Sequence, residues 1–241
     1  MQKTCIIVPC YNEASRFPLK AFQEFLKRDN TLDFCFVNDG SKDATAVILE
    51  SLKKDYTNVT VFNLDKNKGK AEAIRYAVHN INHEHCNYIG YLDADLSTSL
   101  NEMLRLTNFI SPKTQFIMGS RIKTLNTTIK RHPLRHILGR VLATVTNIMI
   151  LKLPIYDTQC GAKLIKTSLA VSIFKEPFVS KWLFDIELLL RSQQILGNDF
   201  SDISIAEVPL QKWFDKGDSR ITWVDFIRIP LDLIKIRNKY R

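Results

Sequence analysis

The first half of the chain alternates between short apolar runs and stretches in which apolar residues recur every three or four positions. A run of roughly four to eight apolar residues bounded by polar ones is typical of a buried strand, whereas the longer spacing predicts an amphipathic helix. The runs predict strands at residues 4–8, 33–37, 59–64, 88–93 and 116–118. The spaced positions predict helices between these strands, at residues 19–26, 47–52, 71–78 and 100–106.

This alternation predicts an α/β fold with a mostly parallel central sheet and helices on both faces. Ligands of such sheets bind just beyond the carboxyl ends of the strands. The rule brings residues 9–13, 38–40 and 93–95 to one rim of the sheet. The sequence contains neither Gly-x-Gly-x-x-Gly nor a P-loop motif, so neither a dinucleotide-binding fold nor a P-loop fold is supported.

The pattern changes after residue 121. Residues 125–136 are polar and basic, and residues 138–149 carry one apolar helical stripe. Further along, the sequence predicts a loop entering a strand at residues 157–164, a helix near residues 183–190 and a strand at residues 203–210.

The C-terminal end, residues 220–241, is basic and amphipathic. Pro230 is expected to kink or split this helix, because proline removes a helical hydrogen bond. We therefore predict one domain at residues 1–215 and a basic amphipathic segment at residues 216–241 that contacts a membrane surface. The simpler alternative is that this segment and the stripe at residues 138–149 pack on the sheet.

Charge and cysteine usage narrow the classes of partner. The 34 Lys and Arg exceed the 25 Asp and Glu, which gives a net charge of +9 and suits polyanions such as nucleotide phosphates or an anionic membrane. The basic residues cluster beside apolar stripes, which argues against nucleic acid. Five cysteines without a Cys-x-x-Cys pair are typical of a reduced, cytosolic protein. With no signal peptide or apolar span, we expect a cytoplasmic protein, peripheral on the inner face of the membrane.

Two aspartates at the end of the central apolar run are the strongest chemical signal. Asp93 and Asp95 would point the same way if the backbone stayed extended, because strand side chains alternate between faces. Two converging carboxylates form a hard oxygen site for Mg²⁺ or Mn²⁺, completed by substrate phosphates. Asp39 can accept a hydrogen bond from a nucleobase, while Pro9 and Tyr11 offer the base a rigid edge and an aromatic face. Together these residues predict a nucleotide site.

Eight short segments carry a resemblance to a known family. Four lie in the first half, at residues 7–13 (IVPCYNE), 37–43 (VNDGSKD), 67–70 (NKGK) and 93–97 (DADLS), and four follow, at 119–121 (GSR), 157–164 (DTQCGAKL), 182–189 (WLFDIELL) and 207–209 (EVP). Together they resemble the inverting family 2 glycosyltransferases, whose fold is of the GT-A type. Within that family they are most similar to dolichyl-phosphate β-glucosyltransferases and, less closely, to dolichyl-phosphate mannose synthases.

The resemblance implies an inverting, metal-dependent hexosyltransferase. Its implied reaction moves glucose from UDP-glucose onto a polyprenyl or dolichyl phosphate, and the alternatives are GDP-mannose as donor or a soluble glycan hydroxyl as acceptor. The eukaryotic glucosyltransferases carry an N-terminal membrane anchor, whereas this chain begins at its first predicted strand, which fits a bacterial-type enzyme. Two rival classes are weaker. A sugar nucleotidyltransferase needs a Gly-rich loop where residues 10–15 stand, and the intact Asp93 and Asp95 argue against a non-catalytic binding module.

The resemblance also assigns roles to individual residues. Those implied to bind the nucleotide sugar are Pro9, Tyr11, Glu13, Asp39, Lys70, Asp93, Ala94, Asp95 and Arg121, with Asp93 and Asp95 as metal ligands. Those implied to bind the acceptor or its phosphate are Arg131, Arg220, Gln159 and Lys163. Gln159 and Lys163 are equally well explained as structural residues of their strand.

The catalytic carboxylate is the remaining expectation. Asp185 occupies the position that the resemblance suggests for a base, and Asp157, at the head of its own motif, is the other candidate. A phosphate monoester has a second pKa near ~6, so a lipid phosphate acceptor is largely dianionic at neutral pH and needs little proton abstraction. We therefore expect Asp185 or Asp157 to position a cation or the sugar rather than to act as an obligatory base.

Overall fold

A computed structural model describes residues 3–130, 139–140, 143–197, 200, 204–217 and 223–240, without the side chains of residues 149 and 223–227. The elements of the first half are β1 (Thr4–Cys10), α1 (Leu19–Arg28), β2 (Leu32–Asp39), α2 (Thr45–Asp55), β3 (Val59–Leu64), α3 (Lys70–Asn80), η1 (His83–His85), β4 (Tyr88–Tyr91), α4 (Leu100–Thr107) and β5 (Phe116–Ser120). Those of the second half are β6 (Thr128–Lys130), the π-helical turn η2 (Asn147–Leu151), β7 (Lys163–Lys166), α6 (Thr167–Ile173), α7 (Phe184–Leu196), β8 (Ile205–Pro209), β9 (Lys212–Phe214) and α8 (Trp223–Tyr240).

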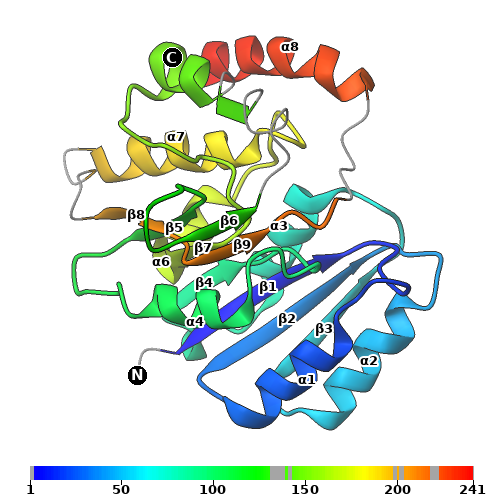
Figure 1. Ribbon diagram of the computed structural model, residues 1–241. Coiled ribbons are helices and arrows are strands. Elements are labelled where there is room, and N and C mark those ends of the chain that lie inside the picture. Colours follow the sequence, from blue (N-terminus) through cyan, green and yellow to red (C-terminus); the bar gives the residue numbers. More distant parts are fainter. Residues whose placement is uncertain are drawn as a thin grey trace.

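A seven-stranded sheet in the order β3-β2-β1-β4-β7-β5-β8 forms the centre of the molecule (Figure 1). β3, β2, β1 and β4 run parallel, and β5 pairs in parallel with β8. β7 lies between β4 and β5 and is antiparallel to both. A separate pair, β6 and β9, is parallel. The predicted α/β class with a mostly parallel sheet is therefore confirmed.

Alternation along the strands sends successive side chains to opposite faces of the sheet, and each face is covered by its own helices. On β1, Ile6 and Val8 belong to a core formed with α1, α2 and α4. Their neighbours Cys5 and Ile7 belong to the other core, formed with α3, α6 and α7. Helices thus cover both faces, as the apolar spacing predicts, and Figure 1 shows the layers.

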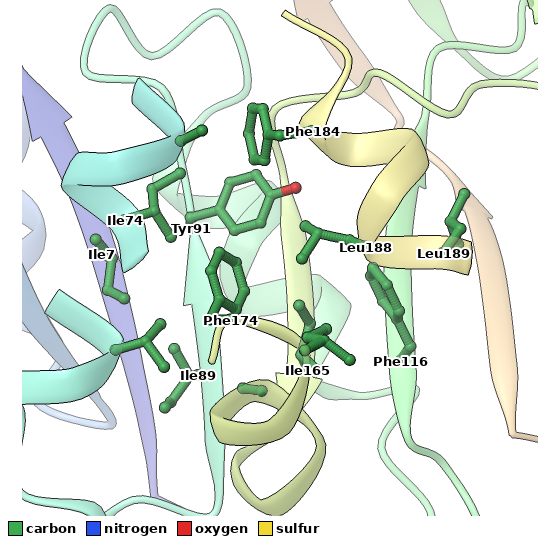
Figure 2. Close-up of a cluster of buried hydrophobic side chains, with 14 of the residues drawn as sticks. Ile7, Ile74, Ile89, Tyr91, Phe116, Ile165, Phe174, Phe184, Leu188 and Leu189 are labelled. Atoms are coloured by element: carbon green, nitrogen blue, oxygen red, sulfur yellow. The ribbon is translucent and has the colours of Figure 1, made fainter. Parts of the chain in front are cut away.

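Aromatic side chains fill both cores. On the first face, Phe22 lies 5.0 Å from Phe17 and 5.1 Å from Phe36 between ring centroids. On the second face, shown in Figure 2, Tyr91 lies at the end of β4 beside Phe184 of α7. The second core continues up to the rim where the predicted site residues lie, so the packing of α7 on β4 fixes part of the site.

The end of β4 and the course of α8 differ from the sequence prediction. β4 ends at Tyr91, two residues before the predicted end at Asp93. The amide of Leu92 still donates to Ile7 O at 3.0 Å, but the chain then turns, with Leu96 N donating to Asp93 O at 3.2 Å. In addition, α8 continues as one helix through the exposed Pro230, so the predicted split does not occur, while a kink there stays a prediction.

α8 packs against α7 through one of its faces. Leu233 and Ile236 are buried in the second core, and Tyr240 Oη accepts from Arg191 Nε at 2.7 Å and donates to Glu187 Oε2 at 2.9 Å. On another face, the side chains of Leu231 and Ile234 are exposed. Thus part of the C-terminal segment packs on the protein and part meets solvent. The domain division at residues 215 and 216 stays a prediction.

No helix within the described part of the chain is long and apolar enough to cross a membrane. All five cysteines lie among the described residues and are free and buried, as expected of small apolar side chains.

Candidate active site

The loops after β1 and β2 brace each other at the carboxyl edge of the sheet. Asn12, in the left-handed region at φ 49°, donates its backbone N–H to Ser41 Oγ at 3.0 Å. Its side-chain oxygen accepts from the backbone N–H of Lys42 at 2.9 Å. Asp43 accepts from the amide of Ala14 at 3.0 Å. These contacts hold the two loops together and keep Pro9 and Tyr11, which are half-buried, at the rim.

Glu13 belongs to the same braced loop. Its backbone N–H donates to Thr45 Oγ1 at 2.8 Å, and its buried carboxylate accepts from Arg16 Nη2 at 2.9 Å. The ion pair with Arg16 stabilises the loop. Contact between Glu13 and a nucleotide therefore stays a prediction.

Asp39 clamps the loop that leads into α3. Its two carboxylate oxygens accept the backbone N–H groups of Lys68 and Gly69, each at 2.8 Å. The neighbouring Gly40 has φ +65°, and a Cβ there would lie 2.5 Å from a backbone carbon of Lys66, so only glycine fits. Because each carboxylate oxygen accepts in two lone-pair directions, the clamp leaves acceptor capacity for a nucleobase.

Asp93 and Asp95 lie in a turn beyond β4, not in an extended strand. Leu96 adopts φ 52°, and Asp95 Oδ1 accepts the backbone N–H of Ser97 at 2.8 Å. The expected mechanism of convergence, alternation along one strand, is therefore wrong. Ala94, between the two aspartates, is buried, so its side chain anchors the turn in the first core.

Lys70, the first residue of α3, reaches Asp93. Its Nζ lies 2.5 Å from Asp93 Oδ1. Burial opposes the charged ammonium, but the carboxylates of Asp93 and Asp185 outweigh it and raise the pKa of Lys70. Behind Asp93 lies Gly161, where a Cβ would stand only 1.9 Å from Asp93 Oδ2. Asp93 is therefore held between an ammonium and a backbone that admits no side chain.

Asp185 is buried in the first turn of α7 and paired with Lys163. Lys163 Nζ lies 2.6 Å from Asp185 Oδ1 and 2.7 Å from Cys160 O, and Tyr91 Oη donates to the same carboxylate oxygen. Burial, together with the charge of Asp185, raises the pKa of Tyr91 well above its usual range, so the phenol keeps its proton. Lys163 is fully buried, which favours the structural alternative for it over phosphate binding.

Asp157 holds Arg121 at the end of β5. Arg121 donates to its carboxylate from Nε at 2.6 Å, from Nη2 at 2.8 Å and from the backbone N–H at 3.0 Å. Although burial opposes the charge, Asp157 raises the pKa of Arg121. The guanidinium also lies 5.3 Å from the Trp213 ring centroid. Glu207 of β8 fixes Asp157 in turn by accepting its backbone N–H at 2.7 Å.

Three predicted residues remain. Gln159 Nε2 donates to Trp182 O at 3.2 Å. This hydrogen bond connects two loops, which favours a structural role for Gln159 over acceptor binding. Arg131 and Arg220 lie outside the described residues. Cys160 is not a nucleophile at neutral pH, because burial and the charge of Asp157 raise the pKa of its thiol to about 11.

The donor chemistry at Asp93 and Asp95 fits a divalent cation that shares its ligands with a substrate. Within the described ranges, no group of three or more His, Cys, Asp or Glu side chains could hold a metal. Mg²⁺ and similar ions are often bound by one or two carboxylates plus substrate phosphates. The ammonium of Lys70 on Asp93 shows that this position already attracts a cation.

Four residues at the site were not singled out from the sequence: Tyr91, Gly161, Glu207 and Trp213. Tyr91 could have been found from its position, since it lies near the end of the apolar run that leads to Asp93. The other three reach the site from distant parts of the chain, and only the fold brings them there.

Known proteins match the chain over most of its length. The family model for Glycosyl transferase family 2 matches residues 5–174. A dolichyl-phosphate beta-glucosyltransferase of Trichomonas vaginalis is 31% identical over 255 residues, covering 99% of this chain and 72% of that protein. The human dolichyl-phosphate beta-glucosyltransferase is 30% identical over 252 residues, covering 98% and 75%.

The fold is also found among solved structures. Glucosyl-3-phosphoglycerate synthase from Mycobacterium tuberculosis, in complex with Mn²⁺, UDP-glucose and phosphoglyceric acid, matches with a TM-score of 0.69 and 15% identity. The match covers 98% of this chain and 80% of that one. The predicted GT-A fold is therefore confirmed.

Gly161→Ala tests the packing behind Asp93. The added Cβ would displace Asp93 Oδ2, so we expect the affinity for Mn²⁺ in the presence of UDP to fall at least about tenfold, ~1.4 kcal/mol. Isothermal titration calorimetry measures this affinity, and circular dichroism checks folding. Gly139→Ala is the matched control, because among the described residues nothing lies within 4 Å of its Cβ position. Equal affinities in the two variants would contradict the prediction.

Proposed function

The chain belongs to glycosyl transferase family 2, and we propose that it transfers glucose from UDP-glucose to a dolichyl or other polyprenyl phosphate with inversion of the anomeric centre. The observation that carries the proposal is the 31% identity to a dolichyl-phosphate beta-glucosyltransferase, which covers 99% of this chain. That similarity extends beyond residue 174, where the family match ends, into the part that carries Asp185 and Glu207.

The proposed binding of the nucleotide is supported by the loops after β1 and β2, which hydrogen bond to each other at the rim. Pro9 and Tyr11 border the base, and Asp39 accepts from it while clamping the loop before Lys70. The loops are already fixed by their own hydrogen bonds, so binding the donor requires little further ordering of the backbone.

Asp93 and Asp95 are the residues that would hold Mg²⁺ or Mn²⁺. The bound ion would act as a Lewis acid that neutralises the diphosphate leaving group. Arg121 is preorganised by Asp157 and by the Trp213 ring, so its guanidinium can stabilise developing negative charge without reorganising.

The acceptor half of the proposal follows from charge. A dianionic lipid phosphate can attack the anomeric carbon without losing a proton, and bare carboxylates nearby would repel it. Asp185 is paired with Lys163, and Asp157 is paired with Arg121. These pairs support a positioning role for both aspartates. Arg131 and Arg220 remain the proposed phosphate ligands of the acceptor.

Membrane contact is part of the same proposal. α8 exposes Leu231 and Ile234 beside the exposed Lys235, a combination typical of helices that lie on an anionic membrane surface. The proposed location is the cytoplasmic face of a membrane, with residues 216–241 as the contacting segment.

A radiochemical transfer assay tests the reaction. With UDP-glucose, dolichyl phosphate and Mn²⁺, we expect a β-linked glucosyl phospholipid. Asp93→Asn and Asp95→Asn should each lower kcat/KM at least about 100-fold, because an amide is a poor ligand for a hard cation. Asp55→Asn, an exposed acid at the end of α2, is the control and should keep full activity. Transfer only from GDP-mannose, or only to a soluble glycan hydroxyl, would overturn the assignment.

A pH–rate profile tests the role of Asp185. We expect kcat/KM to rise through the second pKa of the acceptor phosphate, near ~6, and then to level off. Asp185→Asn alone would leave Lys163 buried and unpaired, so the variant to compare is Asp185→Asn with Lys163→Met. Its rate should fall while the inflection stays in place. Loss or displacement of the inflection would identify Asp185 as the base.

Co-sedimentation with vesicles tests the membrane contact. The intact protein should pellet at low salt with vesicles that contain an anionic phospholipid, and added salt should release it. Leu231→Asp with Ile234→Asp should reduce pelleting several-fold, whereas Val47→Asp, at an exposed apolar position on α2, should not. Unchanged pelleting of the α8 variant would place the contact elsewhere.

A further inference from the structure

We propose that Lys70 is an exchangeable counterion. It holds Asp93 while no divalent ion is bound, and it moves to the nucleotide diphosphate when the ion binds. Metal and nucleotide then bind cooperatively, because each removes an obstacle to the other. This inference rests on the proposed function, since it assigns a role to Lys70 within the same donor site.

The ion pair between Lys70 and Asp93 can be separated at low cost. Nζ lies 2.5 Å from Asp93 Oδ1, yet the two side chains remain 33% and 42% exposed. Each side chain therefore lies partly in solvent, and the pair opens at a lower cost than a fully buried pair. The Lys163–Asp185 pair of the same site differs, because its side chains are 0% and 6% exposed and cannot part at low cost.

Aromatic rings support the ammonium without fixing it. Lys70 Nζ lies 5.6 Å from the Tyr91 ring centroid and 5.8 Å from that of Phe184. Such contacts favour a cation but use no directed hydrogen bond. An ammonium carries three donors. Lys70 can therefore turn toward a new acceptor while it stays beside the same rings.

Competition for Asp93 follows from charge. A divalent ion that binds Asp93 would be brought next to the ammonium, and two cations that close repel each other strongly. Binding of metal alone must therefore displace Lys70 into water. When a diphosphate is present, the displaced ammonium gains anionic oxygens as new partners, which is the usual way in which lysine binds phosphate.

The backbone before Lys70 connects the two ligand sites. Asp39, the proposed base contact, holds the amides of Lys68 and Gly69 at 2.8 Å each. Lys70 follows directly as the first residue of α3. Its Cα is thus anchored, and the proposed exchange moves only its side chain. By linkage, the nucleotide strengthens metal binding by the same factor as metal strengthens nucleotide binding.

Lys70→Met tests the exchange, because methionine keeps an unbranched apolar stem and removes the charge. The dissociation constant for Mn²⁺ is measured on the full chain by electron paramagnetic resonance, with and without UDP. In the wild type we expect UDP to tighten Mn²⁺ binding at least tenfold. In Lys70→Met we expect Mn²⁺ alone to bind at least threefold more tightly than in the wild type, and the effect of UDP to shrink at least fivefold.

Two further variants sharpen the result. Lys54→Met removes an exposed charge from α2, outside the site, and should behave as the wild type. Lys70→Arg should restore most of the effect of UDP. Unchanged or weaker Mn²⁺ binding by Lys70→Met, or an undiminished effect of UDP, overturns the exchange while leaving the donor site intact. A wild type that binds no Mn²⁺ even with UDP overturns both the exchange and the proposed metal site.

Discussion

Carboxylates that the sheet carries to its carboxyl edge need partners, because an unpaired charge at a half-buried position is costly. Asp93 is paired with Lys70, Asp157 with Arg121, and Asp185 with Lys163. Asp39 has no such cation among the described residues and is stabilised by hydrogen bonds from two backbone N–H groups. Because their charges are balanced, these carboxylates repel an anionic substrate less strongly. The loops and helices around the rim hold the cationic side chains in place beside them.

The pairing of these carboxylates depends on contacts between distant parts of the chain. Lys163 comes from β7, inserted between β4 and β5, and meets an aspartate on α7. Glu207 comes from β8 and holds the backbone of Asp157. The first half of the chain thus builds the rim that carries Asp39 and Asp93, and the second half supplies Lys163 and Glu207. The similarity to dolichyl-phosphate beta-glucosyltransferases spans both halves.

The order of strands and helices up to β5, the rim and its aspartates could be predicted because they depend on local patterns. Alternating apolar runs predict a parallel sheet, and a parallel sheet brings Asp39 and Asp93 to one edge. The turn at Asp93 could not be predicted, since Leu96 has no residue-type signal for its left-handed conformation. The antiparallel placement of β7 was equally hidden, because a short apolar run carries no information about its direction. The role of Lys163 depends on that placement.

The direction of β7 also determines which loops can change in length without changing the rim. Since β7 opposes β4, with Lys163 beside Tyr91, the segment that enters β7 lies at the rim, whereas the segments that enter β1, β2 and β4 lie at the opposite edge. Insertions before β2 or β3 lengthen the molecule far from any substrate. Insertions before β7 change the part of the rim that lies beside Asp93. A change in the length of that segment would therefore alter the rim beside Asp93, while the loops after β1 and β2 stay as they are.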